Sequence, residues 1–505
     1  METPLNDPET SGSAGADIAD SDSLAGPAAL NAPPRRPKKG EILEVQIAHM
    51  DEKGRGIAPV PGADISVRHG IPGSKVRVRI GRGKSRKKPD GSLLETLDPG
   101  PHAVDARCPH AGVCGGCAQP RLAYEEQLRQ KERIVRECID SAFLQAEIPS
   151  PSSMVQSVVP AEKLSGYRNK MDFTFGSRRY ILPGEPEGVE ASFGLGLHAP
   201  GLYNKVLDIQ HCDIAFEGAS ALVETARRVA LEMGLDPWDL KTHTGLLRHL
   251  VVRRGERTGE TMVNLVTSER AQERVDPYVA ALLEAHPEIT TLVQNTTTAL
   301  ATVAFGEHEY VHHGSGQIHD VISGKSFSIS ADSFFQTNTA QAERLFEIVE
   351  EEARLATGDV LFDLYCGAGT IGLVIGDGAG SVVGLESAPS SVRDARRNAE
   401  TNGVAHASFV LGDVLAEIEA AGTRGPAPQV VVVDPPRAGL HPKVPAHVLS
   451  LQADRLVYVS CNPKSGSRDV AAFVQGGYRV RAIRPVDLFP HTPHVEVVFA
   501  LERAE

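Results

Sequence analysis

The sequence predicts an α/β fold whose C-terminal part is a parallel sheet with helices on both faces. From about residue 340 onward, apolar runs of strand length alternate with helical stretches. Continuous apolar runs are typical of strands that are buried on both faces. A glycine-rich turn joins the first of these strands to a helix, which is a Rossmann-like arrangement. The apolar runs expected to form strands are 360–364, 382–386, 409–412, 430–434, 456–459 and 495–501.

The length and composition of the chain indicate a multidomain globular protein. Its 505 residues are 41% hydrophobic and 23% charged, which suits about two to four domains. No apolar stretch reaches the ~18 residues of a membrane span, and the acidic N-terminus lacks the apolar core of a signal peptide. We therefore expect a cytoplasmic protein without membrane contact, and a monomer. The expected divisions are an unfolded tail at 1–38, a β-barrel at 39–100, a cysteine segment at 101–120, a helix plus a central α+β unit at 121–330, and the α/β domain at 331–505.

The segment from residue 40 to residue 99 predicts a small OB-like barrel. Its runs at 41–47 and 75–80 alternate polar and apolar residues, as half-buried strands do. The net charge of the chain, −13, argues against binding a polyanion. Residues 75–88 nevertheless hold eight basic side chains and no acid, which suits a phosphate backbone or a solvated charged face. The eight are Lys75, Arg77, Arg79, Arg82, Lys84, Arg86, Lys87 and Lys88.

Three of the seven cysteines lie close together after the barrel. They have the spacing Cys108-x5-Cys114-x2-Cys117, among glycines that let the backbone wrap around a metal centre. A zinc ion or an iron–sulfur cubane needs a fourth thiolate, and Cys212 is the best remaining candidate. The spacing alone leaves zinc and iron–sulfur equally open.

A helix and a mixed domain follow the cysteines. Apolar residues recur at three-to-four spacing between residues 128 and 143, and Cys138 falls on this apolar face as an expected core thiol. Residues 150–325 then carry many β-like runs, which predict a central α+β domain of largely antiparallel strands.

The turn after the first strand of the α/β domain has the pattern of a cofactor site. Residues 363–372 contain G-x-G-x-x-G, and Glu386 ends the next strand, where an acid accepts hydrogen bonds from ribose hydroxyls. These features fit a nicotinamide dinucleotide and S-adenosylmethionine almost equally well as the cofactor. Asp363 favours S-adenosylmethionine, because a carboxylate at this turn would repel a pyrophosphate. Asp413, after the third apolar run, suits the adenine edge of the same cofactor.

Two reactive side chains lie nearer the C-terminus. The fourth strand ends in Asp434-Pro-Pro, and a proline pair forces an open loop at the sheet edge where α/β sites lie. Cys461 follows the next strand within Ser-Cys-Asn-Pro, whose polar residues are unlike the neighbours of a buried thiol. Glu496 opens an apolar strand, where burying a charge is costly and needs a reason. The thiol and the carboxylate can serve as a nucleophile and a base.

Five ordered strings resemble the S-adenosylmethionine-dependent RNA uracil-5-methyltransferase family. They lie at 333–338, 363–370, 434–439, 460–463 and 489–496, and the resemblance extends over nearly everything from residue 40 onward. It implies a class I methyltransferase fold, S-adenosylmethionine as the methyl donor and RNA as the partner. The basic barrel is similar to the RNA-binding TRAM domain that many members carry.

The resemblance also implies roles for individual residues. Cys461 would be the nucleophile that adds to C6 of uracil, and Glu496 the base that removes the C5 proton. The target base must leave its stack, and we expect Phe334, Phe335 or His491 to stack on it. The implied cofactor contacts are Gln336, Tyr365, Thr370, Glu386, Asp413 and Asp434, and the implied ligands of a [4Fe-4S] cluster are Cys108, Cys114, Cys117 and Cys212.

The expected function is therefore methylation of C5 of a uridine in structured RNA. The barrel together with the cysteine cluster favours ribosomal RNA over transfer RNA. An exocyclic-amine methyltransferase shares the Asp-Pro-Pro string and is an alternative, but its chemistry needs no nucleophilic cysteine. Two further alternatives are an RNA-binding iron–sulfur protein with a decayed methyltransferase domain and a nicotinamide oxidoreductase.

Overall fold

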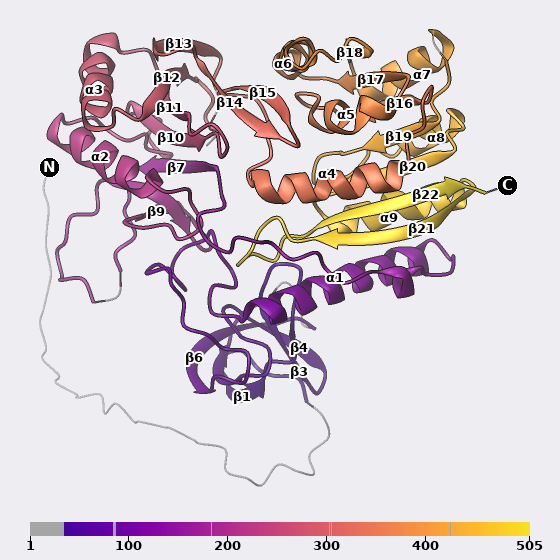
Figure 1. The fold of residues 1–505 in the computed structure, drawn as a ribbon. Coiled ribbons are helices and arrows are strands. Elements are labelled where there is room, and N and C mark those ends of the chain that lie inside the picture. The colour runs from indigo at the N-terminus through magenta and orange to yellow at the C-terminus, as the bar shows by residue number, and fades with distance from the viewer. Residues whose placement is uncertain are drawn as a thin grey trace, which may run out of the picture.

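The structure is a computed structural model, and it describes residues 35–504 except 84–86, 183, 302–303, 305 and 425. The predicted N-terminal tail lies, up to residue 34, outside the described residues. Figure 1 shows a barrel, a central domain and a C-terminal α/β domain, with the long helix α1 (Tyr124–Gln145) between the barrel and the C-terminal domain. No helix in the described part of the chain is long and apolar enough to cross a membrane.

The first domain is a six-stranded barrel, in agreement with the alternating pattern. Its sheet has the order β1-β5-β6-β4-β3-β2. Only residues 47 and 48 separate β1 from β2, so the two strands form one nearly continuous segment. Its first part pairs with β5 and its second part pairs with β3, and this closes the sheet into a barrel. The strands are β1 (Ile42–Gln46), β2 (His49–Met50), β3 (Gly56–Val60), β4 (Ala63–Val67), β5 (Lys75–Ile80) and β6 (Asp90–Asp98).

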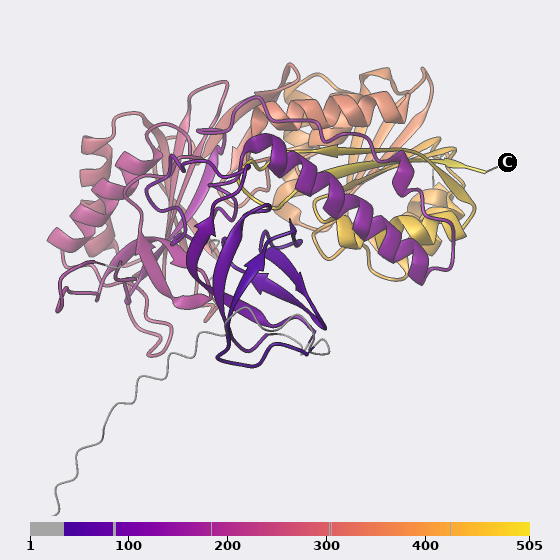
Figure 2. The ribbon, with the colours of Figure 1, turned by 90° about the horizontal axis from the view of Figure 1, so that it is seen from below.

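The barrel packs on the segment that carries the cysteines and on a loop of the C-terminal domain. Gly54, in the turn before β3, has φ 71°, and a Cβ built on it would lie 2.8 Å from the Cβ of Ala118 and 3.4 Å from Pro493. Only glycine allows this close approach. Figure 2 shows the barrel from below, lying beside α1 and in front of the junction of the other two domains.

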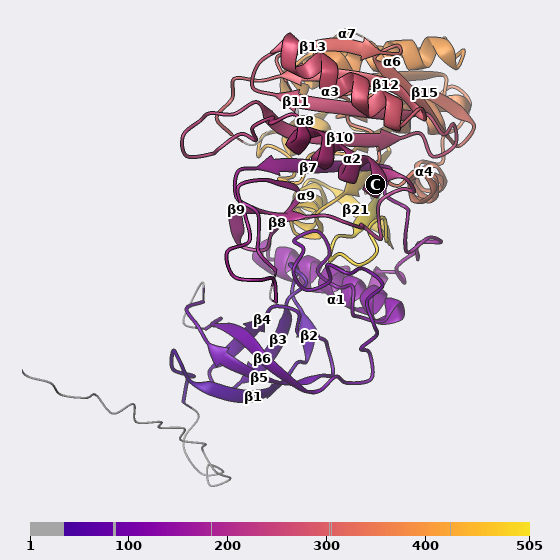
Figure 3. The ribbon, with the colours of Figure 1, turned by 90° about the vertical axis from the view of Figure 1, so that its left-hand side faces the viewer.

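The central domain is a seven-stranded sheet with two helices on one face (Figure 3). Its order is β13-β12-β11-β10-β7-β8-β9, and every pair is antiparallel except β11 with β12. This confirms the prediction of a largely antiparallel domain. Its elements are β7 (Lys170–Gly176), β8 (Gly194–Ala199), β9 (Leu202–Asp208), α2 (Ala219–Glu232), β10 (Leu247–Arg254), β11 (Thr261–Thr267), α3 (Gln272–Ala285), β12 (Ile289–Thr296) and β13 (His308–His313).

The C-terminal domain is the predicted helix-covered sheet. The strand order is β18-β17-β16-β19-β20-β22-β21, in which the first five strands are parallel and β22 runs antiparallel to both neighbours. All four residues of β19 are buried, as a strand covered on both faces requires. The strands are β16 (Val360–Leu364), β17 (Ser381–Glu386), β18 (Ala407–Leu411), β19 (Val430–Val433), β20 (Arg455–Ser460), β21 (Tyr478–Val486) and β22 (Glu496–Arg503). The helices are α4 (Thr339–Ala353), α5 (Thr370–Ile375), α6 (Pro389–Thr401), α7 (Val414–Arg424), α8 (Val444–Ser450) and α9 (Pro463–Gln475).

Two elements that the sequence groups with the central unit pack against the C-terminal domain. The hairpin of β14 (Gln317–Ile322) and β15 (Lys325–Ser330) forms a separate sheet, and its buried side chains join the core beneath α4 and α5. The apolar face of α1 joins the opposite core cluster, beneath α9 and β21. A periodic apolar face shows that a helix packs, but it does not identify the surface that covers it.

Candidate active site

The ends of adjacent parallel strands bring the predicted cofactor residues to one edge of the C-terminal sheet. Tyr365 follows β16, Glu386 ends β17 and Asp413 lies two residues after β18. Burial, followed by the charges of Asp413, Asp469 and Glu386, raises the pKa of Tyr365 to about 12, so Tyr365 lies within electrostatic reach of both predicted acids. Thr370 begins α5, directly after the glycine turn.

The glycine turn is held by the acid that ends β16. Asp363 is buried, and its Oδ2 accepts a hydrogen bond of 2.9 Å from the backbone N–H of Gly372 in α5. Burial raises its pKa to about 7. Tyr365, Gly367 and Gly369 have positive φ values of 64°, 56° and 79°, so the chain turns sharply between strand and helix. Asp363 thus fixes the turn instead of pointing into an open site.

Two of the predicted acids are held in place by backbone amides. Glu386 Oε2 accepts a hydrogen bond from the N–H of Gly367 at 3.1 Å, and its Oε1 accepts one from the N–H of Ala388 at 2.8 Å. Asp413 Oδ1 accepts from the N–H of Ala416 at 3.2 Å and caps α7. These contacts leave acceptor capacity on both carboxylates, because each oxygen has two lone pairs.

Cys461 and Glu496 meet at the end of the pairing between β20 and β22. Ser460, the last residue of β20, pairs with Val497, so Cys461 and Glu496 occupy the next register position. Glu496 is only 6% exposed, while Cys461 is half-buried. Burial, followed by the charges of Glu496 and Asp434, raises the pKa of Cys461 to about 12. Burial and Asp434 raise the pKa of Glu496 to about 8.

Arg437 is a site residue that had no predicted role. Its positive charge opposes the rise in the pKa of both Cys461 and Glu496. The carbonyl of Arg437 accepts hydrogen bonds from Asn462 Nδ2 at 2.9 Å and from Ser465 Oγ at 3.0 Å. The loops after β19 and β20 are therefore tied together through this residue. Its position directly after Asp434-Pro-Pro was a signal that could have pointed to it.

The loop before α4 carries Gln336 and the two candidate stacking phenylalanines. The backbone carbonyl of Gln336 accepts a hydrogen bond from Asn169 Nδ2 at 3.0 Å, which ties the loop to the central domain. Phe334 is 63% exposed. Phe335 is buried against Phe327, with ring centroids 6.0 Å apart, so the expectation that it stacks on the target base is wrong.

A buried ion pair anchors the loop that leads to Glu496. Lys131 Nζ of α1 lies 2.5 Å from Asp487 Oδ1, with both side chains fully buried, and also donates to the carbonyl of Phe489. Asp487 Oδ2 accepts a further hydrogen bond from the Tyr124 hydroxyl at 3.0 Å. His491 is held from both sides, because its N–H donates to Gln127 Oε1 and its ring lies 3.0 Å from the carbonyl of Leu164.

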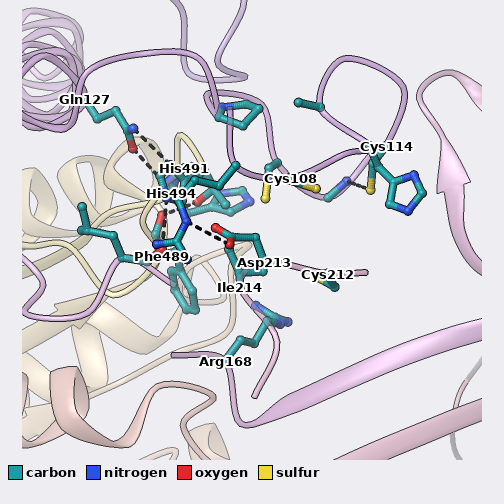
Figure 4. A pocket seen from close by; sticks show the side chains of 18 of the residues that line it. Cys108, Cys114, Gln127, Arg168, Cys212, Asp213, Ile214, Phe489, His491 and His494 are labelled. Atoms are coloured by element: carbon teal, nitrogen blue, oxygen red, sulfur yellow. Dashed lines mark hydrogen bonds and ion pairs between the residues drawn. The ribbon is translucent and has the colours of Figure 1, made fainter. Parts of the chain in front are cut away.

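The four predicted cluster cysteines line one cavity of about 660 Å³. Figure 4 shows Cys108, Cys114 and Cys212 at one end of this cavity and Phe489, His491 and His494 at the other. Burial, followed by the neighbouring thiols, raises the pKa of Cys114 to about 11 and that of Cys117 further. Among the described residues, no three His, Cys, Asp or Glu side chains are arranged to hold a metal ion.

The surroundings of Cys138, and those of the basic residues between 75 and 88, differ from the ones predicted. Cys138 is half-buried and lines a cavity between the barrel, α1 and α9, so the prediction of a core thiol is too simple. The basic run of residues 75–88 is partly paired with acids. Lys75 and Arg77 form ion pairs with Glu44, and Arg77 also pairs with Glu95. Lys84 and Arg86 lie outside the described residues. The run of basic residues is thus partly neutralised by neighbouring strands.

Comparison with known proteins identifies the family. A family model described as tRNA (Uracil-5-)-methyltransferase matches residues 301–417 and 426–504. An uncharacterized RNA methyltransferase of Caldanaerobacter subterraneus is 36% identical over 92% of this chain and 100% of the relative, and one of Chlorobaculum tepidum is 38% identical over 93% and 98%. The chain belongs to the RNA uracil-5-methyltransferase family.

A solved structure supports the same relationship. The tRNA (uracil-54, C5)-methyltransferase of Pyrococcus abyssi, in complex with S-adenosyl-L-homocysteine, superposes with a TM-score of 0.69 at 28% identity. The match covers 91% of this chain and 100% of that one. This member of the family is accordingly an S-adenosylmethionine-dependent RNA uracil methyltransferase with a class I methyltransferase fold.

Proposed function

We propose that the enzyme methylates C5 of a uridine in structured RNA through a covalent bond between Cys461 Sγ and uracil C6, with Glu496 as the base. The observation that carries this proposal is the adjacent placement of the two side chains at the end of the β20–β22 pairing. Asp434 and Arg437 act electrostatically on both groups. A thiol and a carboxyl at the open edge of a methyltransferase sheet match the two groups that the chemistry requires.

The need for both groups follows from the reactivity of uracil. C5 of uracil is a weak nucleophile, and addition of a thiolate to C6 gives an enolate with electron density on C5. S-adenosylmethionine supplies the methyl group from its sulfonium. The C5 proton must then leave to a base, so that the bond between C6 and Sγ breaks and the product is released.

Burial, followed by the charges of neighbouring carboxylates, keeps both groups in their protonated forms. With pKa values of about 12 and about 8, Cys461 is a thiol at neutral pH and Glu496 is largely a carboxylic acid. Arg437 favours the anionic form of each. Its guanidinium lies 3.2 Å from His494 Nδ1, which belongs to the same loop as Glu496. We infer that Arg437, whose attraction for an anion strengthens as substrates exclude water, helps Cys461 and Glu496 to lose their protons to solvent as the substrates bind.

The cofactor is proposed to lie along the ends of the first four parallel strands. Glu386 would accept hydrogen bonds from the ribose hydroxyls, and Asp413 would lie at the adenine edge. Tyr365 and Thr370 flank the glycine turn beside them. Asp434 and Gln336 would contact the methionine end, near the reactive pair. The mutual proximity of Tyr365, Glu386 and Asp413 supports this placement.

The four cysteines are proposed to hold a [4Fe-4S] cluster with a structural role. Their convergence on a single cavity supports this proposal. A tetrahedral zinc ion needs thiolates about 2.3 Å from one centre, whereas a cubane spreads its four ligands over four iron atoms and so holds them farther apart. Four thiolates can complete the coordination of a cubane, and such a cluster would join the segment after the barrel to the central domain.

The proposed substrate is ribosomal RNA, bound in part by the TRAM-like barrel. Arg79, Arg82 and Lys87 of the barrel suit phosphate contacts without base recognition. The full-length similarity to an archaeal enzyme that is named for transfer RNA makes transfer RNA the alternative. An exocyclic-amine methyltransferase is less well supported, because its chemistry would leave Cys461 without a role.

The proposal is tested by mapping the product. RNA from a strain that lacks the gene is incubated with the purified enzyme and S-adenosylmethionine, and modified nucleosides are located by mass spectrometry. We expect 5-methyluridine at one position of ribosomal RNA. A methylated exocyclic amine would refute the reaction, and 5-methyluridine in transfer RNA alone would refute the substrate.

A further inference from the structure

The cysteine cavity has a neighbouring hollow at the edge of the central domain. An open hollow of about 850 Å³ is lined by the loop between β8 and β9 and by Gly115 and Gly116 of the cysteine segment. It shares Gly116 and Leu197 with the cysteine cavity, which in turn reaches Arg437 and His494. We call this open hollow the trough, and it adjoins the cysteine cavity at Gly116 and Leu197.

A small buried cavity adjoins the far part of this trough. Its volume is about 30 Å³, and it shares His198, Tyr203 and Leu240 with the open hollow. Trp238 and Arg248 also line it, with the guanidinium carbon 4.6 Å from the centre of the indole ring. This space is large enough for one or a few oxygen atoms but too small for a base.

The lining of the small cavity holds three unsatisfied polar atoms. Trp238 Nε1, Arg248 Nε and His198 Nδ1 are buried and have no hydrogen-bond partner among the described residues. Arg248 as a whole is only 2% exposed. The indole and guanidinium groups are donors and not acceptors. Since a buried donor without a partner is costly, the cavity is suited to an acceptor oxygen of a ligand or of water.

The rim of the trough is basic and carries an exposed aromatic ring. Tyr203, on the edge strand β9, is 77% exposed. Arg178 and Lys241 are exposed beside it, and the guanidinium of Arg68 in the barrel lies against Gly201. The acid in the lining, Asp239, already accepts hydrogen bonds from the Ser177 hydroxyl and from the backbone of residues 241 and 242. Exposed aromatic rings among cations are typical of surfaces that bind single-stranded nucleic acid.

We propose that the trough holds an unpaired nucleotide of the substrate RNA, whose base stacks on Tyr203 and whose acceptor oxygen enters the cavity beneath Trp238 and Arg248. The inference rests on the proposed function, because it assumes an RNA strand that reaches Cys461. Turning the target uridine out of its stack also unstacks its neighbours, so a site for an unpaired nucleotide along the outgoing strand stabilises the opened RNA.

Trp238 is the chain's single tryptophan and gives this site its own optical signal. A short single-stranded RNA of mixed sequence is titrated into the protein while tryptophan fluorescence is followed. We expect quenching at saturation, and a loss of affinity of about fivefold or more in Tyr203→Ala, since stacking on one aromatic ring contributes about that factor at least. Tyr203→Phe keeps the ring and should bind as the wild type does.

The controls distinguish a base from an anion and from water. Tyr310→Ala removes a tyrosine from β13, at the opposite edge of the same sheet, and should leave the titration unchanged. Heparin has negative charge but no bases. Equal quenching by heparin would show an anion site without base stacking and would overturn the proposal. No change with either ligand would show that the cavity holds water only, and would also overturn it.

Methylation kinetics separate this inference from the proposed function. With RNA from the deletion strain, Tyr203→Ala should raise KM for RNA about fivefold or more, without changing kcat or the modified position. If the wild type makes 5-methyluridine and Tyr203→Ala behaves like Tyr310→Ala, the inference is wrong and the proposed function stands. If the wild type makes no 5-methyluridine, it is the proposed function that fails.

Discussion

Cys461 and Glu496 occupy facing positions at the end of the antiparallel pairing between β20 and β22, one register step beyond Ser460 and Val497. The thiol follows a strand that belongs to the parallel sheet, while the carboxyl begins the strand that returns against it. Both groups are therefore held by strands of one sheet, where the thiol can act in the first step of the proposed reaction and the carboxylate in the last. Each affects the other, since Glu496 is the nearby charge that most raises the pKa of Cys461.

Glu496→Gln should block release of the product more than attack on the substrate. The base acts only after methyl transfer, so the variant should accumulate methylated RNA that is still bonded to the protein. We expect kcat to fall by about a hundredfold or more, the usual contribution of a general base. Denaturing gels of the reaction measure the bonded fraction. Glu502→Gln, at the other end of β22, is the matched control, and wild-type turnover by Glu496→Gln would assign the base elsewhere.

The same substitution should stabilise the substrate-free protein at alkaline pH. Folding raises the pKa of Glu496 from its ordinary value of 4.5 to about 8, so the folded state binds this proton more tightly than the unfolded state. The resulting stability is fully present below about pH 4.5 and is lost as the pH rises through about 8. Urea unfolding should show Glu496→Gln to be more stable than the wild type above pH 8, by on the order of a few kcal/mol. An equal difference at every pH would contradict this titration.

The Lys131–Asp487 pair should be costly to break from one side. Lys131→Met leaves Asp487 buried without a cation and should lower the free energy of unfolding by about 3–5 kcal/mol. The double variant Lys131→Met/Asp487→Asn carries no buried charge and should recover much of this loss. Lys325→Met removes the partner of Asp377, which is exposed at the surface, and should cost about 1 kcal/mol or less. If Lys131→Met also lowers kcat, recovery of kcat in the double variant would show that the unpaired charge disturbs the loop before Glu496 and that neither residue is catalytic.

The four cysteines that line the cavity should bind iron. Protein purified without oxygen should be brown and contain about four irons per chain. Cys212→Ser should lose most of the iron, whereas Cys138→Ser should keep it, because Cys138 lines a different cavity. Stoichiometric zinc without iron in the wild type would refute the cluster.

Local patterns in the sequence were sufficient to predict the candidate residues that lie at the end of a single strand. The apolar runs located β16, β17, β18, β19 and β20, and the polar residues at their ends were therefore expected at one edge. The structure places Glu386, Asp413 and Asp434 at this edge, and their cofactor contacts stay a prediction. The chemistry of such residues is visible because each stands out against an apolar neighbourhood.

Long-range contacts could not be predicted from the sequence. Lys131 and Asp487 are 356 residues apart, and neither has a local pattern that indicates a partner. The register that brings Glu496 to Cys461 is set by the antiparallel pairing of β22 with β20, and no local pattern in either strand indicates it. The burial of Phe335 likewise depends on the hairpin of β14 and β15, which supplies Phe327.

The most direct test of the mechanism is the capture of its covalent intermediate. Substrate RNA in which uridine is replaced by 5-fluorouridine is incubated with the enzyme and S-adenosylmethionine. Fluorine at C5 cannot leave as a proton, so the bond to the protein should persist. We expect a stable adduct whose peptide mass places the RNA on Cys461, and none with Cys461→Ala. An adduct of equal yield with Cys461→Ala, or methylation by this variant at the wild-type rate, would contradict the account.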